Sequence, residues 1–278
     1  MEHKTEEERE SHFWDTFAQG VVAITPVDPT QLDPLSAARL RLVGDVSGRN
    51  VLDLGCGIGF GAALLALRGA HVYAVDVSER CVEVTAERAR VSGVADRVVA
   101  RAMSAYALDF PDSFFDVVHG QDILHHLDVG PAGREVWRVL RPGGRAVFQE
   151  NSANNRLLLV ARRLCGHFGI PKWSTSDEYP LRRKELAELS AIFGGHVEGH
   201  YPVFEFFRLL DMKLFRYHSR LASAACQYLD GIVYDFLPWL RPYGYKQIVV
   251  LTRSRDVSPM SQRWMKTPLR VKERTSRV

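Results

Sequence analysis

The most informative part of this chain is Val51-Leu52-Asp53-Leu54-Gly55-Cys56-Gly57-Ile58-Gly59. An apolar run carrying one acidic residue is followed directly by glycines at alternate positions. Glycine has no Cβ, so its backbone adopts conformations that other residues avoid, and a ligand can approach it closely. A strand that ends in such a turn and leads into a helix is typical of nucleotide-binding α/β proteins. The motif therefore predicts a ligand site at the carboxyl end of a buried strand.

Strand and helix patterns alternate through the first half of the chain. We expect strands at 50–54, 71–75, 97–102, 114–120 and 145–149, and helices at 59–67, 80–91 and 130–140. The helix at 80–91 is expected to be capped by Ser78. The strands are continuous apolar runs, which is typical of a parallel sheet covered by helices on both faces. In such sheets ligands bind at the carboxyl ends of the strands, so functional residues are expected just after each strand.

The flanking segments suggest a division of the chain into three parts. Residues 1–47 are predicted to form an N-terminal helical lid or arm, with helices near 5–20 and 35–43. Residues 48–252 form the α/β domain, whose last strands are expected at 196–201 and 245–252. Between them, 202–245 reads as a helical, aromatic-rich cap insertion, and 253–278 reads as a basic, poorly ordered tail.

Composition limits the classes of protein that this chain can be. Its 278 residues are 46% hydrophobic and 25% charged, which is ordinary for a globular protein. No apolar run is long enough to span a bilayer, and the polar N-terminus shows no secretory signal, so we expect a cytoplasmic protein. The net charge of +3 is unevenly distributed: residues 252–278 carry a net charge of +6. The rest of the chain, its body, has 28 basic and 31 acidic residues and is therefore mildly acidic. The body therefore does not resemble a nucleic-acid binder.

Asp76 is the second signal of a nucleoside site. It ends the second strand, about 20 residues after the glycine turn, where a carboxylate can accept both hydroxyls of a ribose. Glycine spacing leaves a dinucleotide open, since Gly57-x-Gly59-x-x-Ala62 is an allowed variant. Charge favours another ligand: Asp53 repels a pyrophosphate and attracts an ammonium or a sulfonium.

The order of these motifs resembles class I S-adenosylmethionine-dependent methyltransferases of the small-molecule type. The similarity runs from Asp53–Gly59 through Asp76, then 110–116, 122–127 and 140–144. It implies a Rossmann-like fold with a seven-stranded, mostly parallel sheet, an antiparallel last strand and a helical or aromatic cap insertion. It also implies S-adenosylmethionine as the cofactor and S-adenosylhomocysteine as the product.

The resemblance assigns the cofactor residues. Asp53 is placed near the ammonium of the methionine part, which the three glycines line, and Gln121 near the transferring methyl. Asp76 is placed at the ribose and Val77 at the adenine. Many members carry an aspartate after the third strand for the adenine amine, and here that position is Ser104, followed by Ala105. The full set implied is Asp53, Gly55, Gly57, Gly59, Asp76, Val77, Ser104, Ala105 and Gln121.

Candidate catalytic residues follow the fourth strand. His125 or His126 can act as a general base, because an unperturbed imidazole titrates near neutrality, with positioning or packing as the alternative. We expect Asp122 to cap the helix that follows. The substrate-binding candidates are Trp14, Phe17, Glu150, Asn151 and Phe207. No metal-ligand spacing is visible, so metal independence is expected.

These observations predict methyl transfer to a small, hydrophobic or lipid-like metabolite, with oxygen favoured over carbon or nitrogen. The alternatives are a protein or RNA methyltransferase, to which the basic tail could contribute, and a non-catalytic cofactor-binding accessory module. DNA is not expected as the acceptor, because Gln121-Asp122-Ile123-Leu124 lacks the signature of amine-methylating DNA enzymes. The aromatic cap could also form a homodimer interface.

Overall fold

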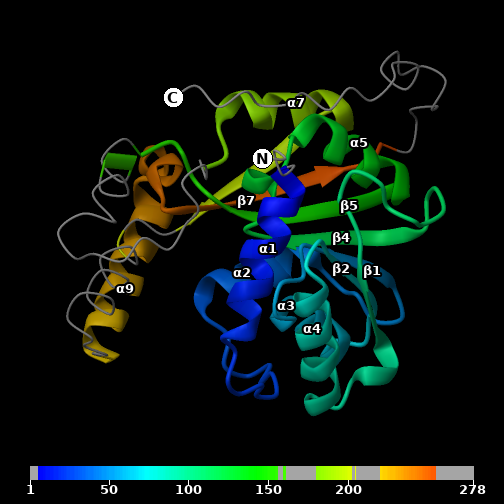
Figure 1. Cartoon of the computed structure of the whole chain (residues 1–278). Coiled ribbons are helices and arrows are strands. Elements are labelled where there is room, and N and C mark those ends of the chain that lie inside the picture. Colours follow the sequence, from blue (N-terminus) through cyan, green and yellow to red (C-terminus); the bar gives the residue numbers. More distant parts are fainter. Residues whose placement is uncertain (1–5, 156–158, 161–179, 202–203, 205–219, 255–278) are drawn as a thin grey trace.

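The computed structural model describes residues 6–155, 159–160, 180–201, 204 and 220–254. Figure 1 shows a central twisted sheet with helices packed against it. Phe207 lies outside the described residues, as does nearly all of the basic tail. The domain boundaries given above stay a prediction.

The sheet has seven strands in the order β3-β2-β1-β4-β5-β7-β6. β1 to β5 run parallel to one another, and β7 runs antiparallel to both β5 and β6. The predicted Rossmann-like fold with an antiparallel last strand is therefore confirmed. The strands are β1 Asn50–Leu54, β2 His71–Asp76, β3 Val98–Ala102, β4 Phe115–Gln121, β5 Leu140–Asn151, β6 His196–Tyr201 and β7 Lys246–Thr252.

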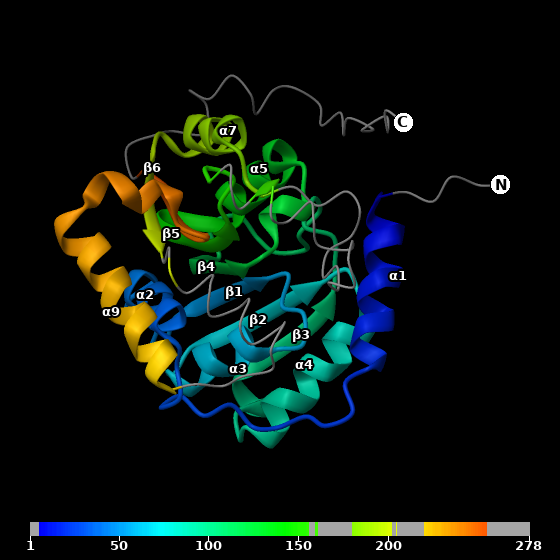
Figure 2. The same ribbon diagram turned by 90° about the vertical axis from the view of Figure 1, so that its left-hand side faces the viewer.

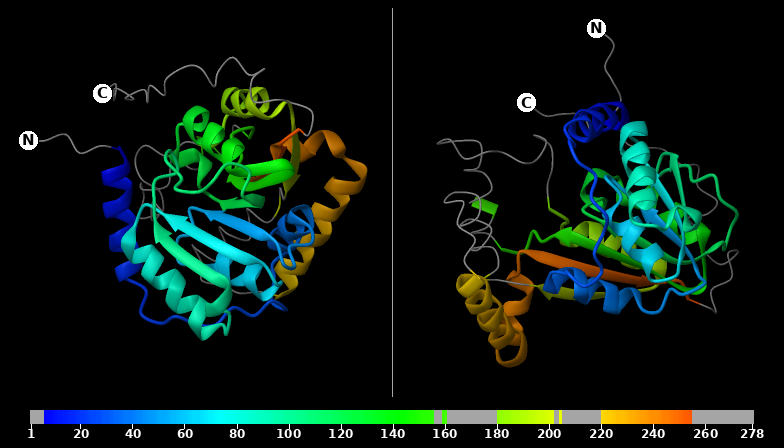
Figure 3. Two further views of the ribbon diagram at one scale, coloured as in Figure 1. Left: turned by 90° about the vertical axis from the view of Figure 1, so that its right-hand side faces the viewer. Right: turned by 90° about the horizontal axis from the view of Figure 1, so that it is seen from below.

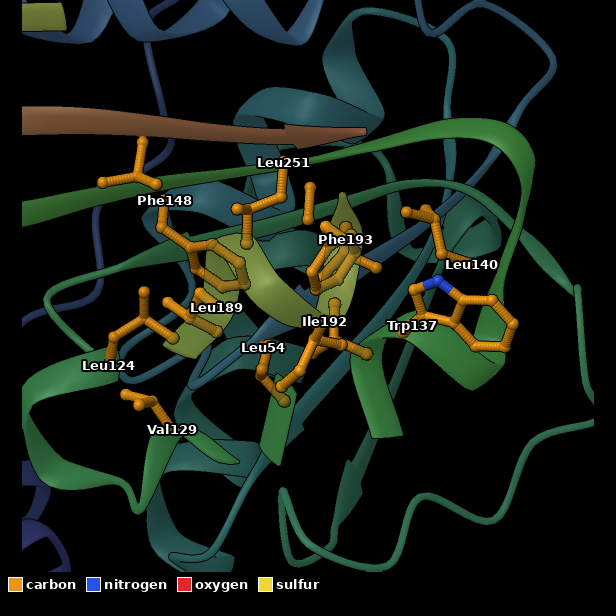
Figure 4. Packing of buried hydrophobic residues seen from close by; sticks show 14 of the residues in the cluster. Leu54, Leu124, Val129, Trp137, Leu140, Phe148, Leu189, Ile192, Phe193 and Leu251 are labelled. Atoms are coloured by element: carbon orange, nitrogen blue, oxygen red, sulfur yellow. The ribbon is translucent and has the colours of Figure 1, made fainter. Parts of the chain in front are cut away.

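Two hydrophobic clusters attach helices to opposite faces of the sheet. The main helices are α2 Pro34–Val43, α3 Phe60–Leu67, α4 Glu79–Val91, α5 Val129–Val139 and α7 Arg183–Phe193. Leu52 and Leu54 pack with α5 and α7, whereas Val51, which precedes them on the opposite face of β1, packs with α2 and α3. This follows from the strand period of two. Figure 4 shows the first cluster, in which Leu189, Ile192 and Phe193 of α7 meet Phe148 and Leu251 of the sheet.

Two further helices lie outside these layers. α1 (Glu6–Gln19) packs against α4, while α9 (Arg220–Phe236) continues into the short helix η3 (Pro238–Tyr243) and then β7. Figures 2 and 3 show α1 and α9 at opposite sides of the molecule. None of the helices in the described part of the chain is both long and apolar enough to cross a bilayer.

The structure corrects one local prediction at the end of β4. Asp122 does not cap a helix: its φ of 55° lies in the left-handed region, and its carboxylate pairs with Lys246. The cap of α5 is Asp128, whose side chain accepts from Gly130 N. By contrast, Ser78 caps α4 as predicted, accepting from Cys81 N at 3.0 Å.

Candidate active site

The glycine loop after β1 is fastened to the neighbouring strand. The N–H groups of Gly55 and Cys56 donate to Val75 O at 2.9 and 3.0 Å. Gly57 has a φ of 52°, and a Cβ built there would meet no atom of the described residues within 4 Å. The loop therefore has open space in front of Gly57, at the carboxyl end of β1.

Asp76 is oriented by the same loop. Its Oδ2 accepts from Gly57 N at 2.9 Å, and its Oδ1 accepts from Ser78 N at 3.0 Å. Burial raises the pKa of this carboxyl above its ordinary value, although both backbone hydrogen bonds oppose the rise. Each oxygen of a carboxylate can accept more than one hydrogen bond, so Asp76 can still receive two ribose hydroxyls.

Asp53 has a partner that the sequence did not reveal. Its Oδ1 lies 2.6 Å from His119 Nδ1, and both side chains are almost fully buried. Asp53 Oδ2 and His119 Nε2 have no hydrogen-bond partner among the described residues. His119 stands within the apolar run of β4, where no spacing relative to Asp53 marks it. The expected contact of Asp53 with a cofactor ammonium stays a prediction.

Arg39 of α2 is a second residue that sequence reasoning missed. Its side chain is 3% exposed, and its Nη1 donates to Gln121 Oε1 at 2.5 Å and to Gln149 Oε1 at 2.9 Å. Burial lowers the pKa of this guanidinium. Its Nε has no partner among the described residues. The available signal was weak, because Arg39 is one of two arginines among the apolar residues of this short helix.

His125 and Glu150 form a buried pair. Glu150 is fully buried; its Oε1 accepts from Ile123 N at 2.9 Å and Leu124 N at 2.7 Å. Its Oε2 lies 2.7 Å from His125 Nδ1. A proton on Nδ1 satisfies this contact and leaves the lone pair of a neutral imidazole on Nε2. These contacts hold Glu150 against the His125 loop, and its expected contact with a substrate stays a prediction.

His126 connects the same loop to the N-terminal helix. Its Nδ1 lies 3.2 Å from Glu10 Oε2, which also accepts from Trp14 Nε1 at 3.2 Å. Burial acts to raise the pKa of Glu10, but the hydrogen bonds of His126 and Trp14 and the charges of His126 and His125 together lower the pKa. The rings of His125 and His126 are 4.2 Å apart. The two histidines therefore have different partners, one in the sheet and one in α1.

The aromatic candidates of α1 are placed differently from one another. The Trp14 ring lies 6.0 Å from that of His126 and 5.3 Å from that of Phe17. Phe17 is 46% exposed. Trp14 is thus beside the candidate site, and Phe17 is at its outer edge.

The remaining candidates lie at the ends of β2, β3 and β5. Asn151 is buried, and its Oδ1 has no partner among the described residues. Ser104 Oγ donates to Glu7 Oε1, and Ala105 is the half-buried residue that follows. Val77 O accepts from a hydroxyl of α1.

The structure also brings together a set of possible metal ligands. Donor atoms of Asp122, His125 and Glu150 lie within 4.8 Å of one another. Each already has a protein partner, since Asp122 pairs with Lys246 and the other two with each other. The expected metal independence stays a prediction.

Comparisons with known proteins agree with this geometry. Residues 52–148 match the family model described as a methyltransferase domain. The chain is 41% identical over 166 residues to methyltransferase GfsG of Streptomyces halstedii, covering 55% of this chain and 60% of that one. It is 33% identical over 134 residues to a ubiquinone biosynthesis O-methyltransferase of Pseudomonas putida, covering 47% and 56%. The chain thus spans about 60% or less of the length of these relatives.

Solved structures share the fold. A geranyl diphosphate C-methyltransferase from Streptomyces coelicolor A3(2) superposes with a TM-score of 0.59 at 19% identity, covering 92% of this chain and all of that one. The [4+2]-cyclase SpnF superposes with a TM-score of 0.56 at 23% identity, covering 89% and 95%. Identities this low show the fold alone. The glycine loop, the oriented Asp76 and the match over 52–148 together establish that the chain contains a domain of the class I S-adenosylmethionine-dependent methyltransferase family.

Proposed function

We propose that this protein transfers a methyl group from S-adenosylmethionine to a hydroxyl oxygen of a small, largely apolar acceptor. The observation that carries the choice of oxygen is the buried His125–Glu150 pair beside the strand ends. A hydroxyl must lose its proton as the new bond forms, and a supported imidazole is suited to receive it.

The residues around the glycine loop fit the cofactor. The space before Gly57 gives its methionine part room, and Asp76, whose two oxygens each accept from one backbone N–H, has acceptor positions left for a ribose. Arg39 is a buried cation whose hydrogen-bond partners in the described chain are amide oxygens, so it suits a carboxylate of the ligand. When bound, S-adenosylmethionine supplies an electrophilic methyl group on a sulfonium.

Residues of this chain can take up the proton that the acceptor hydroxyl loses. The acceptor oxygen forms a bond to the methyl carbon while the carbon–sulfur bond breaks, and the hydroxyl proton passes to Nε2 of His125. Glu150 holds the opposite nitrogen and stabilises the imidazolium that results. The leaving thioether is neutral, so no further charge needs to be stabilised there. Alignment and exclusion of water remain the main tasks of the site.

An apolar acceptor is supported by the edge of the site and by the relatives. Trp14 lies beside His126, and Phe17 exposes much of its ring nearby. One relative is named a 27-O-demethylrifamycin SV methyltransferase, from Amycolatopsis mediterranei, with 42% identity over 101 residues covering 36% of this chain and 37% of that one. Together with the ubiquinone O-methyltransferase, it favours hydroxylated small molecules as acceptors.

Trideuteromethyl-labelled cofactor tests the proposal directly. The purified chain is incubated with it and a panel of phenols, enols and alcohols, and labelled products are located by mass spectrometry. His125→Asn is expected to lower turnover by about 10²- to 10⁴-fold while S-adenosylhomocysteine affinity is retained. His71→Asn is the matched control, because His71 is exposed at the opposite end of β2.

Three results would contradict parts of this proposal. Failure of the wild-type chain to bind S-adenosylhomocysteine removes the cofactor assignment. Full turnover by His125→Asn would show that His125 is not the general base. If only carbon, nitrogen, RNA or protein acceptors become labelled, the proposed hydroxyl acceptor is wrong and the labelled class is the substrate.

A further inference from the structure

One face of α1 lies across the ends of β2 and β3. Glu7, Ser11 and Asp15 are four residues apart, so they project from the same side of the helix. Glu7 Oε1 accepts from Ser104 Oγ at 2.5 Å, and Asp15 Oδ1 accepts from Ser78 Oγ at 2.5 Å. Between them, Ser11 Oγ donates to a backbone carbonyl at 3.3 Å. Three hydrogen bonds in register thus hold α1 against this edge of the site.

The strand order indicates which part of a nucleoside would reach that edge. The glycine loop follows β1, Asp76 ends the adjacent strand β2, and β3 is next outward. Neighbouring strands are about 4.8 Å apart. A nucleoside whose ribose is held by Asp76 therefore places its base toward the end of β3, where Ser104 and Ala105 lie.

We propose that Glu7 recognises the amine of the cofactor's adenine, so that α1 supplies the carboxylate that the end of β3 lacks. This inference rests on the proposed function, because it requires an adenosyl cofactor. Ser104 Oγ accepts from Tyr106 N at 3.1 Å and donates to Glu7, so the hydroxyl acts as a positioning group for the carboxylate.

The polar groups here match the edge of adenine. An ionised carboxylate offers about four acceptor positions, and Ser104 uses one of those on Glu7. Among the described residues, the hydrogen bonds found do not involve the N–H of Ala105. Adenine presents an amine donor beside the N1 acceptor, which pairs with a carboxylate beside an N–H. Hypoxanthine presents the reverse, a carbonyl acceptor beside an N1–H donor.

Calorimetry with two ligands tests the assignment without any turnover. S-adenosylhomocysteine and S-inosylhomocysteine differ only in this edge of the base. The wild-type chain is expected to prefer the adenosyl ligand, and Glu7→Gln is expected to lower that preference by about tenfold or more, because an amide can donate to the hypoxanthine carbonyl. Glu8→Gln makes the same charge change at the exposed neighbouring position and is expected to keep the preference.

The ratio of the affinities for the two ligands distinguishes recognition of adenine by Glu7 from a role in docking α1 alone. If Glu7→Gln weakens both ligands by one factor, Glu7 only docks α1 and the proposal is overturned. A double variant provides a rescue test. Combining Glu7→Gln with Ser104→Asp returns a carboxylate to the end of β3 and is expected to restore the preference for the adenosyl ligand. Equal wild-type affinities overturn the inference but leave the proposed function intact, whereas no binding of either ligand overturns both.

Discussion

The same substitution at two glycines of the loop should have two different effects. Gly57→Ala places a methyl group where no described atom lies within 4 Å, at a φ of 52°. Holding a residue with a Cβ in the left-handed region costs about 1–2 kcal/mol, so the unliganded fold loses about that much. Gly59→Ala adds a Cβ 2.7 Å from Thr85 Cα, a backbone atom of α4. Overpacking adds about 1–3 kcal/mol, for a total of about 2–5 kcal/mol.

Urea unfolding and calorimetric titration separate these effects. Gly59→Ala is expected to shift the unfolding midpoint clearly further than Gly57→Ala, measured without ligand. Gly57→Ala is expected to weaken S-adenosylhomocysteine about tenfold or more, because its methyl group occupies the ligand's space. The variant keeps the N–H that donates to Asp76, so that carboxylate stays oriented.

Two results would refute this reasoning. Wild-type ligand affinity in Gly57→Ala means that the space before the loop is not the methionine subsite. Equal stability of the two variants means that the approach to Thr85 is relieved by movement of α4.

The remaining predictions concern a cation, a carboxylate and a metal. Arg39→Met is expected to weaken S-adenosylhomocysteine by about tenfold or more, and unchanged affinity would exclude Arg39 as the carboxylate partner. Burial raises the pKa of Asp76 above 3.8 in the free protein. Ribose hydroxyls bind the ionised form, so affinity should rise as pH rises through that raised pKa, and Asp76→Asn should flatten the titration. Chelation with EDTA should leave methyl transfer intact, and a loss restored by Mg²⁺ would place a cation at Asp122, His125 and Glu150.

The parallel half of the sheet was predictable because its signals are local. Buried parallel strands are continuous apolar runs, and glycine, proline or a capping residue ends each element. The strand expected at 50–54 is β1 Asn50–Leu54, and the helix expected at 80–91 is α4 with its predicted cap. The position of the glycine loop and of Asp76 at one edge of the sheet was predictable from their spacing, since the ends of consecutive parallel strands meet at the same edge.

What could not be predicted is which distant side chains meet. Arg39 and Gln149 are 110 residues apart, and Glu7 and Ser104 are 97 apart. Local periodicity places each residue on a face of its own element, but the partner depends on how helices dock outside the sheet. The insertion at 202–245 was expected to be helical and α9 lies within it, but the bounds of this helix were not predicted.

The left-handed turn at Asp122 shapes the loop that directly follows β4. Asp tolerates this conformation better than most residues with a side chain. Its N–H donates to Gln149 O at 2.8 Å and its carboxylate pairs with Lys246, so the turn is held by both β5 and β7. The turn directs two successive N–H groups at one oxygen of Glu150, and His125 contacts the other oxygen. A carboxylate fixed in this way can orient the imidazole of His125, so the backbone at Asp122 supports the general base that we propose.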